Sequence, residues 1–388
     1  MRAVPSVFLL GCVASLAAQR TIVVDANRGA GFNFVDIPPA VAVAQDGDTI
    51  LVRSGDYASV SLVNKAIALL GQPGARILTA APFGSAAAVE IVRLGAGREV
   101  TVRGFRAEGA YGEVGEFVVE GCAGRVLLED LDAQTDVSIA NSNGVVMNRC
   151  TWGGTAWCRF ALNVSMTSCV GRGDTAGGAT MPGLGVLGGS VTCADCSFTG
   201  VPGLGGGLFF PGGPGIRLYG STLQLAGGAN NVVTGSPVNG GSSTPAILGD
   251  GQSTLEIDPD IVLVGYNGPA IANVTVQTSQ LATLTVQTGS IGTVATVGLA
   301  GNPGELYVLF FALLGDPLPV PALGGDLWLD PATITLGATG MLGASGNTTS
   351  SYPTPNLPDL IGRAFAWQGA TGLTTFRLTN PVGFTHLP

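Results

Sequence analysis

The sequence predicts an all-β protein, in which a right-handed parallel β-helix with an N-terminal capping helix is followed by a C-terminal β-sandwich-like domain. Three observations lead to this prediction. A triplet of apolar residues recurs along residues 19–264, a short amphipathic helix precedes it, and a different strand pattern occupies residues 265–388. The 61 glycines and 23 prolines among 388 residues supply frequent turns. Charged residues make up only 11%, which excludes coiled coils and charge-rich disordered chains.

Residues 1–18 have the pattern of a secretory signal peptide. Arg2 supplies a positive start, Val7–Leu16 an apolar stretch, and Ser15–Ala17 a small-residue cleavage pattern. The apolar stretch is too short to span a bilayer, and no other segment reaches membrane length. We therefore expect a secreted or cell-surface protein. Lipidation at Cys12 is an alternative, because Cys12 follows a Leu-Leu-Gly sequence that resembles a lipoprotein box.

The capping helix is expected over Asp36–Ala44. Asp36 is a suitable N-cap, two prolines fit the first turn, and the residues that follow form an apolar face. Strands are expected at Thr49–Arg53 and Ala66–Gly71, with a turn at Ser54–Tyr57 between them. A solenoid must have its first coil covered, and this helix supplies the cover.

The repeat places apolar residues at positions i, i+2 and i+5. The first two lie on one face of a strand, and the third fits a chain that has turned a corner and points inward again. Strong copies begin at Val100, Val126, Val145, Val164 and Val191, and weaker copies at Leu223 and Leu255. Short strands that recur once per coil, with Gly-rich turns of varying length, favour a parallel β-helix. An antiparallel barrel would show hairpin signals instead.

Two stretches resemble a known superfamily. The sequence DIPPAVAVAQDGDTILVRSGDY, followed by KAIALLGQPG, is similar to the capping helix and first coils of right-handed parallel β-helix proteins of the pectin-lyase-like superfamily. The resemblance covers about residues 21–262 and implies the fold. That superfamily contains pectate, pectin and alginate-type lyases, polygalacturonases, phage tailspikes, adhesins and many uncharacterised secreted proteins, so the resemblance does not select one activity.

Residues 265–388 are expected to form a separate β-sandwich. Five short strands separated by Gly, Pro and Asn turns are predicted at Glu305–Leu314, Gly325–Leu329, Thr333–Leu336, Ala364–Gln368 and Thr374–Leu378. The stretches GGDLWLDP, PNLPDLIGRAFAWQG and LTNPVGFT resemble a C-terminal domain of uncharacterised secreted bacterial proteins. We expect this domain to cap the solenoid, with carbohydrate binding and anchoring as alternatives.

The cysteines after residue 18 are expected to pack inside the coils. In the repeat register Cys150, Cys169 and Cys196 share one inward column, while Cys193 belongs to another. Two alternatives remain: disulfides, with Cys122 and Cys158 as one candidate pair, and a zinc site, because Cys193-x-x-Cys196 is half of one. Zinc would need four convergent ligands, and the column is otherwise apolar, so we predict no metal there.

The outward polar column is the first candidate for chemistry. Aligning the coils stacks Arg103 on Glu129, and places Asp130, Arg149 and Asp195 beside that column. A β-elimination lyase needs a cation and a base, and a glycoside hydrolase needs paired carboxylates. These five residues supply the groups for either reaction. The simpler interpretation is that Arg103–Glu129 and Asp130–Arg149 are ion pairs between adjacent coils.

Three further features bear on binding. Trp152 and Trp157 follow a predicted strand in a Gly-rich turn and are candidates for a sugar-stacking platform, with packing against the coils as the alternative. An acidic loop with Tyr111, flanked by Glu108, Glu113 and Glu116, is a candidate calcium site or a solvated loop. His386 is the chain's one histidine, which argues against histidine catalysis, and the sequence lacks the Asn-Thr-Asp, Gly-His-Gly and Arg-Ile-Lys motifs that mark polygalacturonases.

The leading hypothesis is a secreted, monomeric β-helix protein that binds or displays to extracellular polysaccharide, without a recognisable catalytic motif and without a required cofactor. The net charge of −9 and the absence of a basic stripe make nucleic acid a poor partner. One alternative is a polysaccharide lyase or glycoside hydrolase that uses the outward face of the β-helix. The other is an adhesin or surface-structural solenoid.

Overall fold

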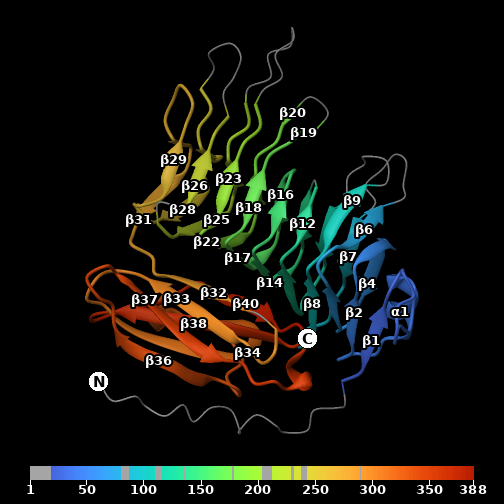
Figure 1. Ribbon diagram of the computed structural model, residues 1–388. Coiled ribbons are helices and arrows are strands. Elements are labelled where there is room, and N and C mark those ends of the chain that lie inside the picture. Colours follow the sequence, from blue (N-terminus) through green and yellow to red (C-terminus); the bar gives the residue numbers. More distant parts are fainter. Residues whose placement is uncertain are drawn as a thin grey trace.

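The computed structural model describes residues 19–79, 87–109, 116–134, 136–176, 179–202, 212–228, 231–236, 243–288 and 290–388. These residues form a parallel β-helix of three long sheets and an antiparallel C-terminal domain beside it (Figure 1). The predicted all-β fold class is therefore confirmed. The predicted signal peptide, including Cys12, lies outside the described residues. Within them no helix is both long and apolar enough to cross a membrane.

The β-helix has three sheets, here named A, B and C in the order in which each coil visits them. Sheet A contains β1 (Thr21–Val24), β2 (Thr49–Val52), β5 (Ala68–Gly71), β8 (Glu99–Arg103), β11 (Arg125–Glu129), β14 (Asn143–Asn148), β17 (Leu162–Thr167), β22 (Ser190–Ala194), β25 (Thr222–Ala226), β28 (Thr254–Ile257) and β31 (Thr275–Thr278). Sheet B contains β3 (Gly55–Ala58), β6 (Ala75–Thr79), β9 (Arg106–Gly109), β12 (Asp132–Ala133), β15 (Thr151–Trp152), β18 (Val170–Arg172), β23 (Ser197–Thr199), β26 (Val232–Thr234) and β29 (Val262–Val264). Sheet C contains β4 (Val60–Val63), β7 (Ala87–Val92), β10 (Glu116–Glu120), β13 (Val137–Ala140), β16 (Ala156–Arg159), β21 (Leu184–Leu187), β24 (Ile216–Tyr219), β27 (Ile247–Leu248) and β30 (Ile271–Ala272). A small hairpin, β19 (Thr175–Ala176) and β20 (Ala179–Thr180), extends from the stack.

The apolar triplets have the predicted register. Val100, Val126, Val145, Val164 and Val191 are paired from coil to coil in sheet A, and their exposed fractions lie between 0% and 2%. The third members of these five triplets are also buried after the corner: Phe105, Leu131, Cys150, Cys169 and Cys196. The repeat therefore identified the inward face of the solenoid correctly.

In five consecutive coils, a single left-handed residue lies at the corner between sheets A and B. Successive coils place Gly104, Asp130, Arg149, Ser168 and Asp195 there, with φ between 52° and 79°. Only glycine adopts this conformation without steric cost, so four of these five corners carry some backbone strain. The turn explains why the third apolar residue of each triplet points inward after a polar pair.

The N-terminal end of the solenoid is covered as predicted. Helix α1 (Ile37–Val43) begins after Asp36, whose Oδ1 accepts a 2.8 Å hydrogen bond from the Ile37 nitrogen, and Ile37, Ala40 and Val41 are buried beneath it. One local expectation was wrong: most of the segment assigned to a turn at Ser54–Tyr57 belongs to strand β3, because its backbone pairs in parallel with β6.

The C-terminal domain is built from two antiparallel sheets. One contains β32 (Thr283–Gln287), β33 (Val294–Ala300) and β37 (Asn347–Pro353). The other contains β34 (Leu306–Val320), β35 (Gly325–Leu329), β36 (Thr335–Met341), β38 (Ala364–Gly372), β39 (Phe376–Leu378) and β40 (Val382–Thr385). Their facing side chains form an aromatic core that includes Phe365, Trp367 and Phe384. The five strands expected from the sequence overlap with β34, β35, β36, β38 and β39.

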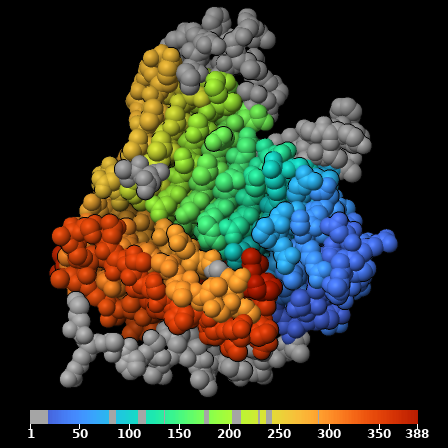
Figure 2. Space-filling view, in the orientation of Figure 1, coloured from blue at the N-terminus to red at the C-terminus, as the bar shows by residue number. Residues whose placement is uncertain are grey.

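The domain lies along the side of the solenoid and does not cap it (Figures 1 and 2). Leu127 and Val146 of sheet A share a buried cluster with residues of β34, β35 and β38. At the far end of the solenoid, inward-facing Val276 is 41% exposed, whereas its neighbour Leu255 in the preceding coil is 1% exposed. The expectation of a cap was therefore wrong. The parallel sheets also run past residue 264, because β31 still pairs with β28.

Candidate functional site

The outward polar column of sheet A is an interface between the two domains. Arg103, Glu129, Asn148 and Thr167 stack in the expected register. Residues 380–385 of the C-terminal domain lie over them and satisfy their polar atoms. The Asn148 Nδ2 donates to the Gly383 carbonyl at 3.1 Å, the Asn380 Nδ2 donates to the Thr167 Oγ1 at 3.0 Å, and an Arg103 nitrogen donates to the Thr385 carbonyl.

Four charged side chains close this interface. The Glu129 carboxylate is fully buried and accepts hydrogen bonds from Arg149 Nη2 at 2.6 Å and from the Thr385 nitrogen at 2.9 Å. Arg149 Nε also donates to Asp130 Oδ1 at 2.7 Å, and Arg103 Nε donates to Asp130 Oδ2 at 3.0 Å. Burial raises the pKa of Glu129 although both arginines oppose the shift. We call these four residues the interdomain latch.

The latch corrects the prediction of a catalytic site on this face. Arg103 and Glu129 have side-chain exposures of 7% and 0%, so a polysaccharide cannot reach them while the domains are docked. Asp130 and Arg149 are partly exposed but are paired with each other. Asp195 lies two coils beyond Arg149 and accepts a hydrogen bond from Asn231 Nδ2 at 3.5 Å. These candidates therefore do not form one site. The ion-pair interpretation describes the observed contacts.

Trp152 is also not a sugar platform. It is 2% exposed, its Nε1 donates to the Gly183 carbonyl at 2.8 Å, and its ring lies 6.1 Å from that of Phe198 inside sheet B. The neighbouring coil makes room for the indole, because a Cβ on Gly171 would lie 2.4 Å from Trp152 Nε1. The packing alternative is correct for this tryptophan.

Trp157 lies on the outward face of sheet C, among other aromatic and cationic side chains. Its indole lies over bare backbone, since a Cβ on Gly185 in the next coil would be 2.4 Å from the ring. The Arg159 guanidinium lies 5.2 Å from the Trp157 ring centre, and Phe160 is 59% exposed. Two coils further on, Arg217 lies 5.8 Å from the Tyr219 ring. We call Trp157, Arg159, Phe160, Arg217 and Tyr219 the aromatic strip.

A shallow trough leads to the aromatic strip along sheet C. It has a volume of about 580 Å³ and is lined by small or polar side chains that include Ser61, Glu90, Val118 and Ser138. Ser138 is the direct cross-strand neighbour of Trp157. The trough and the strip therefore form one continuous surface that follows the solenoid axis.

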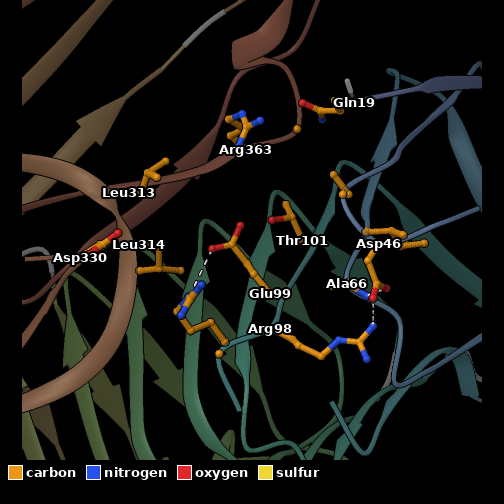
Figure 3. A pocket seen from close by; sticks show the side chains of 16 residues that line it. Gln19, Asp46, Ala66, Arg98, Glu99, Thr101, Leu313, Leu314, Asp330 and Arg363 are labelled. Carbon is orange, nitrogen blue, oxygen red and sulfur yellow. Dashed lines mark hydrogen bonds and ion pairs between the residues drawn. The ribbon is translucent and has the colours of Figure 1, made fainter. Parts of the chain in front are cut away.

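A second concave site lies between the domains (Figure 3). This interdomain cleft has a volume of about 510 Å³. Sheet A contributes Glu99 and Thr101, the first coils contribute Gln19 and Asp46, and the C-terminal domain contributes Arg363, together with other lining residues. Sequence reasoning missed this cleft, because it exists only where two distant segments meet.

The carboxylates of the cleft have different electrostatic surroundings. Burial raises the pKa of Glu99, although Arg125 Nε lies 3.4 Å from its carboxylate and opposes the shift. Burial also acts on Asp46, but hydrogen bonds from the Ala66 nitrogen and from Arg98 lower the pKa of Asp46 overall. Asp46 therefore ionises more readily than Glu99.

The cysteines of the coils are packed side chains. All six in the described residues are buried and free, so the alternative of a Cys122–Cys158 disulfide is wrong. The nitrogen of Cys169 donates to Cys196 Sγ at 3.5 Å, and the thiol of Cys150 donates to the Leu128 carbonyl at 3.4 Å. In the part of the chain that the structure describes, no cluster of His, Cys, Asp and Glu side chains is suited to a metal ion.

The proposed acidic calcium loop is only partly described. Tyr111 and Glu113 lie outside the described residues, and the side chain of Glu116 is not described. Glu108 pairs with Arg106 at 2.7 Å and with Arg76 at 3.4 Å.

Comparison with known proteins gives little beyond the fold. No protein-family model matches the chain, and no curated protein matches it. Among solved structures, the chain is similar to the enzymatically active domain of tailspike protein 2 of bacteriophage CBA120, with a TM-score of 0.38 and 9% identity over 95% of this chain and 71% of that chain. It is also similar to the A-module of the mannuronan C-5 epimerase AlgE4 of Azotobacter vinelandii, with a TM-score of 0.21 and 12% identity over 62% of this chain and 93% of that chain.

Proposed function

We propose that this chain is a secreted β-helix protein that binds extracellular polysaccharide along the outward face of sheet C. The observation that carries the proposal is the aromatic strip. Soluble proteins seldom expose several large aromatic rings side by side, and such patches mark interaction sites. Trp157 and Tyr219 lie on paired strands, so their rings are held in fixed positions before any ligand arrives.

The chemistry of the strip suits a sugar chain. The C–H faces of a pyranose ring are apolar and pack against aromatic faces, whereas its hydroxyl groups need hydrogen-bonding partners. Trp157, Phe160 and Tyr219 offer aromatic surface, and Arg159 and Arg217, whose guanidinium groups lie over the Trp157 and Tyr219 rings, offer hydrogen-bond donors. A polymer that lies on the strip would continue into the trough past Ser138 and Glu90.

The arginines also favour acidic glycans locally. The chain has a net charge of −9, which repels polyanions on average. Arg159 and Arg217 reverse this effect over a short distance, because exposed charges act only within about 8–10 Å at physiological salt. Binding to acidic polysaccharide should therefore depend strongly on salt.

The experiment uses residues 19–388 and a panel of neutral and acidic polysaccharides. Affinity electrophoresis measures retention, and counting of new reducing ends measures cleavage in the same samples. We expect retention by at least one polysaccharide, lost on Trp157→Ala and kept in Phe32→Ala, an exposed aromatic on another coil. Retention that Trp157→Ala leaves unchanged would refute the proposed surface. New reducing ends would instead support the lyase or hydrolase alternative.

A further inference from the structure

The interdomain cleft is suited to a small ligand that both domains would hold. Its volume of about 510 Å³ falls in the range of small-molecule sites. Glu99 and Thr101 form its floor on strand β8, and Arg363 borders it from the segment that leads into β38 (Figure 3). This cleft faces sheet A, whereas the aromatic strip is on sheet C.

Three residues that line the cleft carry buried polar atoms without a hydrogen-bond partner in the part of the chain that the structure describes. Thr101 is 1% exposed, and its Oγ1 makes no hydrogen bond within the described residues. The Oε1 of Gln19 and the Nε of Arg98, which are also buried atoms, have no partner there either. Buried polar atoms are nearly always hydrogen-bonded, so these three need a partner from outside the described chain. Together they require a ligand that both donates and accepts hydrogen bonds, as hydroxyl groups do.

Three arginines (Arg98, Arg125 and Arg363) and three carboxylates (Asp46, Glu99 and Asp330) line the cleft, and among the described residues Arg363 has no carboxylate in direct contact. Arg98 pairs with Asp46, and Arg125 pairs with Glu99. Within the described residues Arg363 forms no ion pair, and its Nε donates to the Asp359 carbonyl at 3.0 Å. The charge of Arg363 acts on Glu99 without an ion-pair contact. Its planar guanidinium fork matches the geometry of a carboxylate.

From these observations we propose that the interdomain cleft binds a small polyhydroxylated carboxylate, of the size of one or two sugar-acid units. Its carboxylate pairs with Arg363, and its hydroxyl groups meet Thr101, Gln19 and Arg98. A bulky apolar ligand is disfavoured, because it would leave these polar atoms unsatisfied. The ligand touches residues of both domains, so its binding also stabilises their docking.

The test titrates residues 19–388 with D-glucuronate, with D-glucose and acetate as comparison ligands, and measures dissociation constants by calorimetry. We expect glucuronate to bind more tightly than either comparison ligand. Arg363→Gln should weaken glucuronate binding about tenfold or more, which corresponds to the loss of one charge-assisted contact. Thr101→Val, which keeps the side-chain shape, should weaken it severalfold.

The controls separate this proposal from the proposed function. Arg172→Gln removes an exposed arginine of β18, outside the cleft, and Trp157→Ala removes the centre of the aromatic strip; both should leave glucuronate binding unchanged. Melting temperatures of the free variants verify that each is folded. Absence of glucuronate binding, or binding that Arg363→Gln and Thr101→Val leave intact, would overturn the inference without affecting the strip.

Discussion

The carboxylate of Glu129 accepts a 2.9 Å hydrogen bond from the backbone nitrogen of Thr385, a residue 256 positions further along the chain. This contact joins a strand in the middle of the solenoid to the last strand of the C-terminal domain. Glu129 is fully buried, and its other oxygen is held by Arg149. The residue that resembles a catalytic carboxylate in the sequence therefore serves to join two domains.

Replacing Glu129 should be costly for stability. Glu129→Ala leaves Arg103 and Arg149 paired only with the partly exposed Asp130. Removing one member of a buried ion pair costs about 3–5 kcal/mol, and the remaining Asp130 pairs place this variant near the lower end of that range. Asp132→Ala is the matched control, because the Asp132 side chain is 52% exposed and its loss should cost within about 0.5 kcal/mol. Urea unfolding followed by circular dichroism measures both. Equal urea midpoints for Glu129→Ala and Asp132→Ala would contradict a stabilising role for the buried latch.

The stability of the protein should respond to pH through Glu99. Burial raises the pKa of Glu99 in the folded chain, so the folded state holds this proton more tightly than the unfolded state does. The stabilisation that comes from the protonated Glu99 carboxyl is fully present below the unfolded pKa of about 4.3 and is lost as the pH rises through the folded pKa. As the pH rises above about 4.3, the wild type should therefore lose stability relative to Glu99→Gln, as measured by urea midpoints.

Glu256 supplies the opposite control for that experiment. Burial opposes its ionisation, but hydrogen bonds from Arg377, Ser279 and Gln224 lower the pKa of Glu256 overall. Its contribution is present above the unfolded pKa and is lost as the pH falls through the lower folded pKa. The free energy of unfolding of the wild type should therefore exceed that of Glu256→Gln at pH 5, and this difference should become smaller as the pH falls to 3. A difference in unfolding free energy that grows on acidification would refute the lowered pKa of Glu256.

The two tryptophans of one coil should separate stability from binding. Trp152→Ala leaves a cavity inside the solenoid and should cost about 3–5 kcal/mol of unfolding free energy. Trp157→Ala removes a partly exposed ring and should cost about 1 kcal/mol or less, while it lowers polysaccharide affinity about tenfold. Denaturant titration and affinity electrophoresis on both variants give the comparison. Polysaccharide affinity that falls in Trp152→Ala but not in Trp157→Ala would place the sugar site elsewhere.

The arginines of the aromatic strip should control the salt dependence of binding. The double variant Arg159→Gln and Arg217→Gln should bind acidic polysaccharide about three- to tenfold more weakly at low salt, and its affinity should vary less with salt. Arg28→Gln, which removes an exposed arginine of the first coil, is the matched control. Retention measured across a series of salt concentrations distinguishes them. If the affinity of the double variant varies with salt as steeply as that of the wild type, a direct charge contact between these arginines and the polysaccharide is excluded.

The thiols of the coils should be inert while the protein is folded. Burial raises the pKa of Cys158 to about 12, and burial also raises the pKa of Cys122. Since the thiolate is the reactive form, the native protein should not react with Ellman's reagent at pH 8. In denaturant the chain that starts at residue 19 should release six equivalents. Reaction of the native protein would mean that the coils open.

The sequence predicted the solenoid well because its signal is local. The spacing of Val126, Leu128 and Leu131 fixes which side chains point inward, and the same spacing in each coil fixes the register between coils. The cap of α1 is equally local, since Asp36 bonds to the very next residue. A pattern that recurs over short distances needs no knowledge of the rest of the fold.

The site could not be predicted in the same way, because it depends on contacts between distant segments. A polar column is expected on a solvent-facing strand, and nothing in the local pattern of Arg103 or Glu129 shows that residues 380–385 cover it. The burial of Trp152, by contrast, could be predicted from local sequence. In the register of sheet B its neighbours are Ala133 and Gly171, and two small residues beside a large one indicate that the large one fills their space.

The latch also constrains the order in which the parts of the protein fold. The coils need only their immediate neighbours, so they can assemble one after another as the chain emerges. Glu129 and its two arginines, by contrast, stay hydrated until β40 has been made and has returned to them. The closing step has a high contact order, and loop closure over such a distance is slow. A substitution in β40 should therefore act late, and leave an assembled solenoid with an undocked second domain.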